Sequence, residues 1–145
     1  HAARRASRLL GGAFGRGLYR WFNAGVRWLL PMAFADRKRL TPAMRRHYEG
    51  PFLHARDRFA AWILARELYG SNAFYDEVWR DRAALAGKPM RIVWGTRDPA
   101  FREHHLARWM EAFPNATVRR VEVGHFVQEE APEVLREEVA RFLAV

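Results

Sequence analysis

Asp98 and His125 each follow a short apolar run that ends in glycine. The two runs, Met90–Trp94 and Thr117–Val123, are rich in β-branched residues, which is typical of buried parallel strands. A carboxylate bonded to one imidazole nitrogen fixes the tautomer of the ring, and the other nitrogen can then take a proton from water. The two side chains are therefore of the types that a hydrolytic acid–histidine relay requires.

A strand–helix–strand unit would bring these two side chains together. Residues 101–113 have helical apolar spacing, and Pro114 ends that pattern. Two parallel strands joined by a crossover helix have their carboxyl ends at the same edge of the sheet. We therefore expect Asp98 and His125 to meet at that edge.

The sequence around both residues resembles a known family. Ile92-Val-Trp-Gly-Thr-Arg-Asp-Pro-Ala-Phe101 and Gly124-His-Phe-Val-Gln-Glu-Glu-Ala-Pro-Glu133 are similar to the last third of the haloalkane dehalogenase and epoxide hydrolase branch of the α/β-hydrolases. The relay order in that family is nucleophile, acid, histidine. The resemblance implies that Asp98 is the acid and His125 the base, that the substrate is a small molecule, and that no cofactor or metal is used.

The fold class expected from this resemblance is α/β, as the C-terminal portion of an α/β-hydrolase fold. A helical cap, or lid, is predicted over residues 1–70, and two parallel strands with flanking helices over residues 71–145. Leu40-Thr-Pro42 and Tyr48-Glu-Gly-Pro-Phe52 resemble the cap of the dehalogenases. The similarity thus runs from about residue 40 to the end.

Helices are predicted before the first strand from apolar spacing and from Gly and Pro stops. Four glycines within residues 9–17 indicate a loop or a poorly formed turn. Residues 18–29 form an amphipathic pattern that ends near Pro31, with Leu18, Phe22, Val26 and Leu29 on its apolar face. Further helices are expected over residues 42–49, 54–69 and 72–86, the last with Phe74, Val78 and Leu85 inward, and a C-terminal helix is expected to begin near Pro132.

The nucleophile is missing from the sequence. Its two serines, Ser7 and Ser71, lie outside any Gly-x-Ser-x-Gly elbow, and no aspartate follows a strand in an equivalent turn. With 145 residues, the chain is shorter than a complete hydrolase of this type. We expect it to be the C-terminal part of a longer protein, with the nucleophile and oxyanion hole upstream, and to be inactive by itself.

The identity of that nucleophile would decide the reaction. In a dehalogenase, an upstream aspartate displaces halide and water activated by His125 hydrolyses the ester. Trp21 and Trp28 are then the lid candidates for halide-binding N–H donors. An epoxide hydrolase would instead use two lid tyrosines, and a carboxylic-ester hydrolase an upstream serine.

Charge and composition bear on partners and location. The net charge of +9 comes from residues 1–50, which hold eleven Arg or Lys against two acids. A rival hypothesis is therefore a non-catalytic domain that binds a partner through this basic, aromatic third. No nucleic-acid motif and no apolar run of about 20 residues is present, so nucleic acid and membranes are not expected partners. The absence of cysteine excludes disulfides and fits a cytoplasmic protein. The oligomeric state stays open.

Two further groups of ionisable residues are predicted to have no role in the chemistry. Glu129 and Glu130 are adjacent and point in different directions, so we expect surface charge that stabilises a helix start. His104 and His105 are helix neighbours with no third ligand, so we expect solvated side chains and no metal site.

Overall fold

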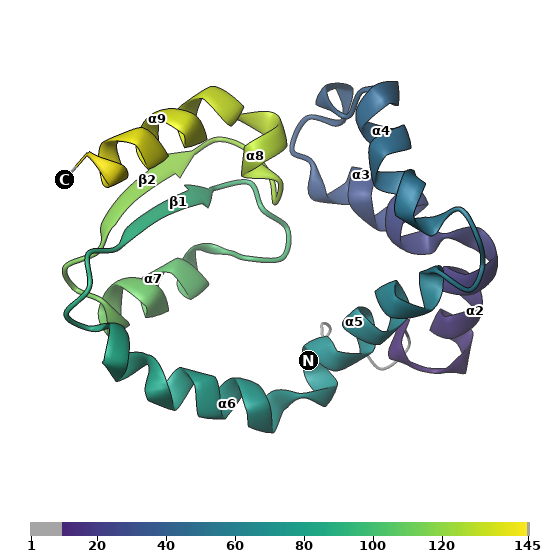
Figure 1. Cartoon of the computed structure of the whole chain (residues 1–145), viewed down its shortest axis with the longest axis horizontal. Coiled ribbons are helices and arrows are strands. Elements are labelled where there is room, and N and C mark those ends of the chain that lie inside the picture. The colour runs from purple at the N-terminus through teal and green to yellow at the C-terminus, as the bar shows by residue number, and fades with distance from the viewer. Residues whose placement is uncertain (1–9, 145) are drawn as a thin grey trace. The chain divides into compact units, whose positions relative to one another are not determined.

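The computed structural model describes residues 10–144, which form two compact units (Figure 1). The first unit contains residues 10–30 and 42–83 and is helical, and the second contains residues 31–41 and 84–144 and holds both strands. This division differs from the boundary expected at residue 70. The assignment of residues 1–70 to a lid stays a prediction, and residues 1–9 lie outside the described part.

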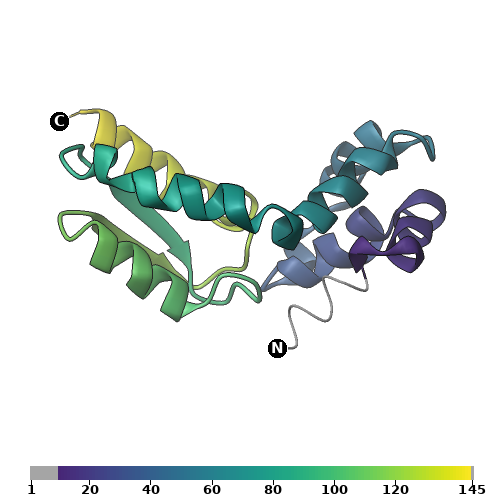
Figure 2. The same ribbon diagram turned by 90° about the horizontal axis from the view of Figure 1, so that it is seen from below.

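The first unit is built mainly from α2 (Ala13–Phe22), α4 (Pro42–Glu49), α5 (Arg58–Gly70) and α6 (Asn72–Arg80). A π-helix spans Gly25–Leu29, and short 3-10 turns span Gly50–Phe52 and Asp81–Leu85. α2 packs on α5, and α5 contacts α6. Figure 2 shows the same elements after a turn of the view.

The loop or poorly formed turn predicted over residues 9–17 is wrong from Ala13 onward, because α2 begins there and contains Gly15 and Gly17. Gly15 is buried, and a Cβ at this position would lie 1.8 Å from the carbonyl oxygen of Leu10. The glycine therefore permits a close approach between turns of the backbone and does not mark a loop.

The single helix predicted over residues 18–29 is also wrong. Asn23 adopts a left-handed conformation with φ 52° and ψ 45°, which asparagine tolerates better than most residues, and this ends α2. Because the helix is interrupted, the periodic pattern no longer gives the buried face. Tyr19 is buried, whereas Phe22 and Leu29, expected inward, are exposed.

The two helices before the first strand differ from their predicted bounds. α5 begins at Arg58 instead of residue 54, and α6 gives way to a 3-10 turn at Asp81. Phe74, Val78 and Leu85 are exposed, contrary to the prediction. Helical spacing reveals an apolar face but does not show which segment covers it.

The second unit confirms the predicted parallel strand–helix–strand arrangement. β1 (Arg91–Gly95) and β2 (Thr117–Val121) pair in register from Arg91 with Thr117 to Gly95 with Val121. α7 (Glu103–Ala112) joins them, and α8 (Val127–Glu130) and α9 (Pro132–Leu143) follow. Figures 1 and 2 show α7 and α9 on opposite faces of the sheet.

The core of the second unit also uses residues from the segment between the two parts of the first unit. Leu106 of α7, Phe113 and Val123 are buried, and so are Phe34 and Leu40. α3 (Leu30–Ala33) leads into this segment. Within residues 10–144, no helix is long and apolar enough to cross a membrane.

Candidate active site

Asp98 is held in a turn directly after β1. The backbone N–H groups of Thr96 and Arg97 donate to carbonyls at the end of β2 and just beyond it, at 2.8 and 3.0 Å. The Oδ1 atom of Asp98 then accepts hydrogen bonds from the backbone N–H groups of Ala100 (2.7 Å) and Phe101 (3.0 Å). These bonds fix the carboxylate through one oxygen and leave the other for a second partner.

His125 lies in the loop that follows β2. Its backbone N–H donates to the carbonyl oxygen of Ala33 at 2.8 Å. The Phe101 ring stacks on the imidazole with centroids 5.4 Å apart and planes 21° apart, and the Phe126 ring meets it edge-on at 5.2 Å. The imidazole thus has apolar aromatic neighbours on two sides.

The two side chains are in contact, which confirms the expected meeting at the sheet edge. His125 Nδ1 lies 2.8 Å from Asp98 Oδ2. The Asp98 side chain is 8% exposed and that of His125 is 36% exposed. In a neutral ring that donates through Nδ1, the lone pair is on Nε2, which is the arrangement for accepting a proton. The geometry suits an acid–base pair, and the catalytic roles stay predictions.

Two glycines at the strand ends permit this contact. A Cβ on Gly95 would lie 2.2 Å from the carbonyl oxygen of Gly124, and a Cβ on Gly124 would lie 2.3 Å from that of Ala33. Neither glycine has a positive φ. Both positions therefore require glycine for close backbone approach and not for an unusual backbone conformation.

Glu130 is buried, contrary to the prediction of a surface charge, and is 1% exposed. Its carboxylate accepts hydrogen bonds from the backbone N–H groups of Ala35 (3.1 Å to each oxygen), Asp36 (3.0 Å) and Gly124 (2.7 Å). Two of these donors precede it by more than ninety residues, so no local sequence signal could have revealed them.

His105 is likewise not simply solvated. Its Nδ1 accepts a hydrogen bond from the backbone N–H of Arg102 at 3.0 Å and so caps the start of α7. His104 is exposed, as predicted. Among the residues that the structure describes, no cluster of three or more His, Cys, Asp or Glu could hold a metal.

Trp21 and Trp28 belong to the first unit and are 65% and 47% exposed. The Arg20 guanidinium lies 5.0 Å from the centroid of Trp21, and Trp28 stacks with Phe22 at 6.2 Å. Their halide-binding role stays a prediction.

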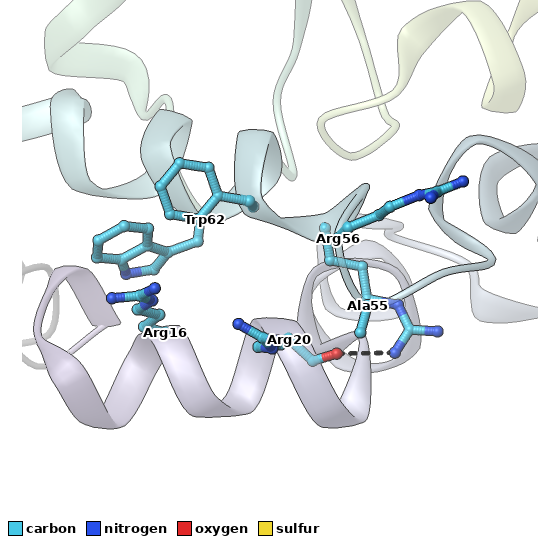
Figure 3. A pocket seen from close by; sticks show the side chains of 7 residues that line it. Arg16, Arg20, Ala55, Arg56 and Trp62 are labelled. Carbon is cyan, nitrogen blue, oxygen red and sulfur yellow. Dashed lines mark hydrogen bonds between the residues drawn. The ribbon is translucent and has the colours of Figure 1, made fainter.

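The first unit also contains a cavity of about 260 Å³ between α2 and α5, shown in Figure 3. Two of its four arginines, Arg16 and Arg58, make contacts between α2 and α5. Arg58 donates to the backbone carbonyls of Phe52, Leu53 and Arg20, at 2.8 to 2.9 Å. The Arg16 guanidinium lies 5.6 Å from the ring centroids of both Phe59 and Trp62. The cavity is lined by Arg16, Arg20, Ala55, Arg56, Arg58, Phe59 and Trp62. The hypothesis of a partner-binding basic third stays a prediction.

Comparison with known proteins finds similar sequences and similar solved structures. No family model matches the chain. A cis-3-alkyl-4-alkyloxetan-2-one decarboxylase from Xanthomonas campestris pv. campestris is 32% identical over 130 residues, which cover 84% of this chain and 41% of the decarboxylase. The crystal structure of haloalkane dehalogenase DbeA from Bradyrhizobium elkani matches 99% of the chain with a TM-score of 0.83 and 23% identity. Haloalkane dehalogenase DatA from Agrobacterium tumefaciens C58 matches 98%, with a TM-score of 0.75 and 22% identity.

The extent of these matches agrees with the partial fold expected from the sequence. The chain spans 51% of DbeA and 49% of DatA, which is about half the length of each dehalogenase. The helical region followed by two parallel strands corresponds to the C-terminal part of their fold. The chain therefore has the C-terminal part of an α/β-hydrolase fold, in the form found in these haloalkane dehalogenases.

Proposed function

We propose that this chain supplies the acid–histidine pair of a haloalkane dehalogenase-like hydrolase. His125 acts as general base, and Asp98 orients its ring. The observation that supports this is the 2.8 Å contact between Nδ1 and Oδ2, in which the acid is nearly buried and the imidazole remains accessible. A buried carboxylate stabilises the imidazolium that forms when Nε2 takes a proton.

The reaction proposed has two steps. A carboxylate nucleophile, supplied by a segment corresponding to the other half of the dehalogenases, displaces halide from carbon and forms an ester. Water then attacks the ester carbonyl while its proton passes to Nε2 of His125. The alcohol leaves, the carboxylate is restored, and the proton is released to solvent.

The substrate class proposed is a small haloalkane. The aromatic rings of Phe101 and Phe126 beside the imidazole suit an apolar substrate. Trp21 and Trp28 are proposed to donate indole N–H groups to the leaving halide.

The test is the Asp98→Asn variant of the complete gene product, assayed by bromide release from 1-bromobutane. The amide keeps the shape of the carboxylate but cannot select the same imidazole tautomer, so kcat should fall by about 10⁴-fold, as in the serine protease relay. Glu133→Gln, which alters an exposed carboxylate paired with Arg136, should retain the wild-type rate. Wild-type kcat in the Asp98→Asn variant would refute the assigned relay.

A second candidate is decarboxylation of a β-lactone, favoured by the 32% identity to the oxetan-2-one decarboxylase. That reaction cleaves the four-membered ring into an alkene and CO2 and consumes no water, whereas hydrolysis adds water to the substrate. Product analysis therefore separates the two. A cis-3,4-dialkyloxetan-2-one converted to alkene and CO2, without bromide release from a bromoalkane, would favour the decarboxylase.

A further inference from the structure

Two carboxylates of the second unit are almost completely buried, and they are stabilised in different ways. Glu138 is 2% exposed and pairs with the guanidinium groups of Arg91 and Arg141. The Glu130 carboxylate, 1% exposed, is surrounded by the backbone N–H groups of Ala35, Asp36 and Gly124. A buried charge is costly unless its oxygens are hydrogen-bonded, so this arrangement depends on all of these donors.

The donors to Glu130 come from two segments that are distant in sequence. Gly124, which directly precedes His125, donates at 2.7 Å in a fully buried bond. Ala35 and Asp36 belong to residues 31–41, the segment packed in the second unit. A single side chain therefore links the backbone beside the proposed base to that segment.

Other contacts join the same two segments. The His125 backbone N–H donates to Ala33 at 2.8 Å, and the Phe34 and Phe126 rings stack with centroids 5.4 Å apart. The Arg39 guanidinium donates to the backbone carbonyl of Glu130. The loop of residues 122–126, which carries His125, is therefore held to residues 31–41 on both sides of His125. Phe126 contacts Phe34, and Gly124 is bonded to the Glu130 carboxylate.

We infer that Glu130 is a positioning residue for His125. Its carboxylate fixes the Gly124 backbone from which the His125 side chain starts, and so sets the reach of Nδ1 toward Asp98. The kinetic part of this inference rests on the proposed function, whereas the structural part does not. Glu130 does not touch the imidazole in any described contact and acts through the backbone.

Only a carboxylate of this length satisfies the three donors. A glutamine offers one acceptor oxygen, and its NH2 group would face a backbone N–H, so a donor would meet a donor. An aspartate keeps both oxygens but is one methylene shorter. Glu130→Gln should therefore release either the Gly124 N–H, which donates to Oε1, or the Asp36 N–H, which donates to Oε2, and the loop that carries His125 should lose its fixed position.

The experiment is proton NMR of the hydrogen-bonded Nδ1–H of His125 in the complete protein, assigned by its loss in His125→Gln. This signal reports the geometry of the imidazole whether or not the protein is an enzyme. Glu130→Gln should broaden or abolish the resonance and lower kcat by about 10²-fold, as expected for a misplacement near 1 Å, with KM nearly unchanged. Glu130→Asp should recover part of both.

Glu138→Gln is the matched control, because it makes the same change at an equally buried carboxylate of the same unit. It should lower the melting temperature but keep the Nδ1–H resonance and kcat. A wild-type resonance in Glu130→Gln, or an equal loss in Glu138→Gln, would overturn the inference. If no substrate is hydrolysed yet Glu130→Gln still removes the resonance, the proposed function fails and the positioning role stands.

A measurement on the unaltered protein covers the case in which the variants do not fold. Hydrogen exchange of the Gly124 amide should be as slow as that of the β1 and β2 amides, because its N–H is bonded to a buried carboxylate. Exchange at the rate of an exposed loop amide would overturn the inference.

Discussion

Replacing Gly95 with alanine tests whether the meeting of Asp98 and His125 depends on close backbone approach. The added Cβ would lie 2.2 Å from the carbonyl oxygen of Gly124 and 2.8 Å from that of Val123. Ordinary contact distances are near 3.5 Å, so the Gly124 carbonyl would have to retreat by about 1 Å. Both obstructing atoms are backbone, so no side-chain rotation relieves the clash.

The expected loss of folding stability follows from the hydrogen bonds that this displacement breaks. The bond from the Arg97 N–H to Val123, now 3.0 Å, and the 2.8 Å contact between Asp98 and His125 would both exceed hydrogen-bonding range. Overpacking costs about 1–3 kcal/mol and each of the two lost hydrogen bonds about 1 kcal/mol, so destabilisation of about 3–5 kcal/mol is expected. At roughly 3 °C per kcal/mol, the melting temperature should fall by about 9–15 °C.

The assay is thermal unfolding by circular dichroism, combined with the His125 Nδ1–H resonance. Gly87→Ala is the control, because a Cβ there would have nothing within 4 Å and the glycine has no positive φ. That variant should melt at the wild-type temperature or slightly above it. A Gly95→Ala protein with wild-type melting and an intact resonance would refute the explanation given for glycine at this strand end.

Three further outcomes concern stability. Leu106→Ala should lower the free energy of unfolding by about 2–5 kcal/mol in urea titration, because Leu106 is fully buried, and a loss below 1 kcal/mol would contradict its place in the core. Burial raises the pKa of the Tyr19 hydroxyl above its ordinary value near 10. Because the tyrosine of the unfolded chain therefore ionises first, the contribution of Tyr19 to folding stability is complete below that ordinary pKa and is lost as pH rises further. Tyr19→Phe should accordingly flatten the alkaline loss of stability in urea midpoints measured between about pH 9 and 11. Gly17→Ala should raise the melting temperature, with a gain of about 0.5–1 kcal/mol, because Gly17 lies in α2 with open space at its Cβ, and lowered stability would contradict the helix.

The contact between Asp98 and His125 could be predicted because it depends on few assumptions. Two apolar runs separated by a helical pattern indicate two parallel strands joined by a crossover helix. Parallel strands have their carboxyl ends at the same edge of the sheet. The observed register from Arg91 with Thr117 to Gly95 with Val121 is what that arrangement requires.

The wrong predictions have two physical causes: backbone groups distant in the sequence, and one residue with a left-handed conformation. Glu130 looks like a solvated helix-start charge, and its burial depends on N–H groups of Ala35 and Asp36 that carry no side-chain signature. Asn23 interrupts a helix that the apolar spacing favours, because one left-handed residue costs little in asparagine. Apolar periodicity identifies the apolar face of a helix. It does not show where the helix is interrupted or which segment covers that face.

The two units are interleaved along the sequence, and this limits which segments can be exchanged between this protein and its relatives. Residues 31–41 belong to the strand-containing unit although helical residues of the other unit precede and follow them. A chimera that exchanges residues 42–83 alone would keep the hydrogen bond between the Ala33 carbonyl and the His125 N–H. It would also keep the bonds from the Ala35 and Asp36 amides to Glu130. A graft that runs from the start of the helical region through residue 83 would import foreign partners for Glu130, so donor and recipient would need matching acids at that position.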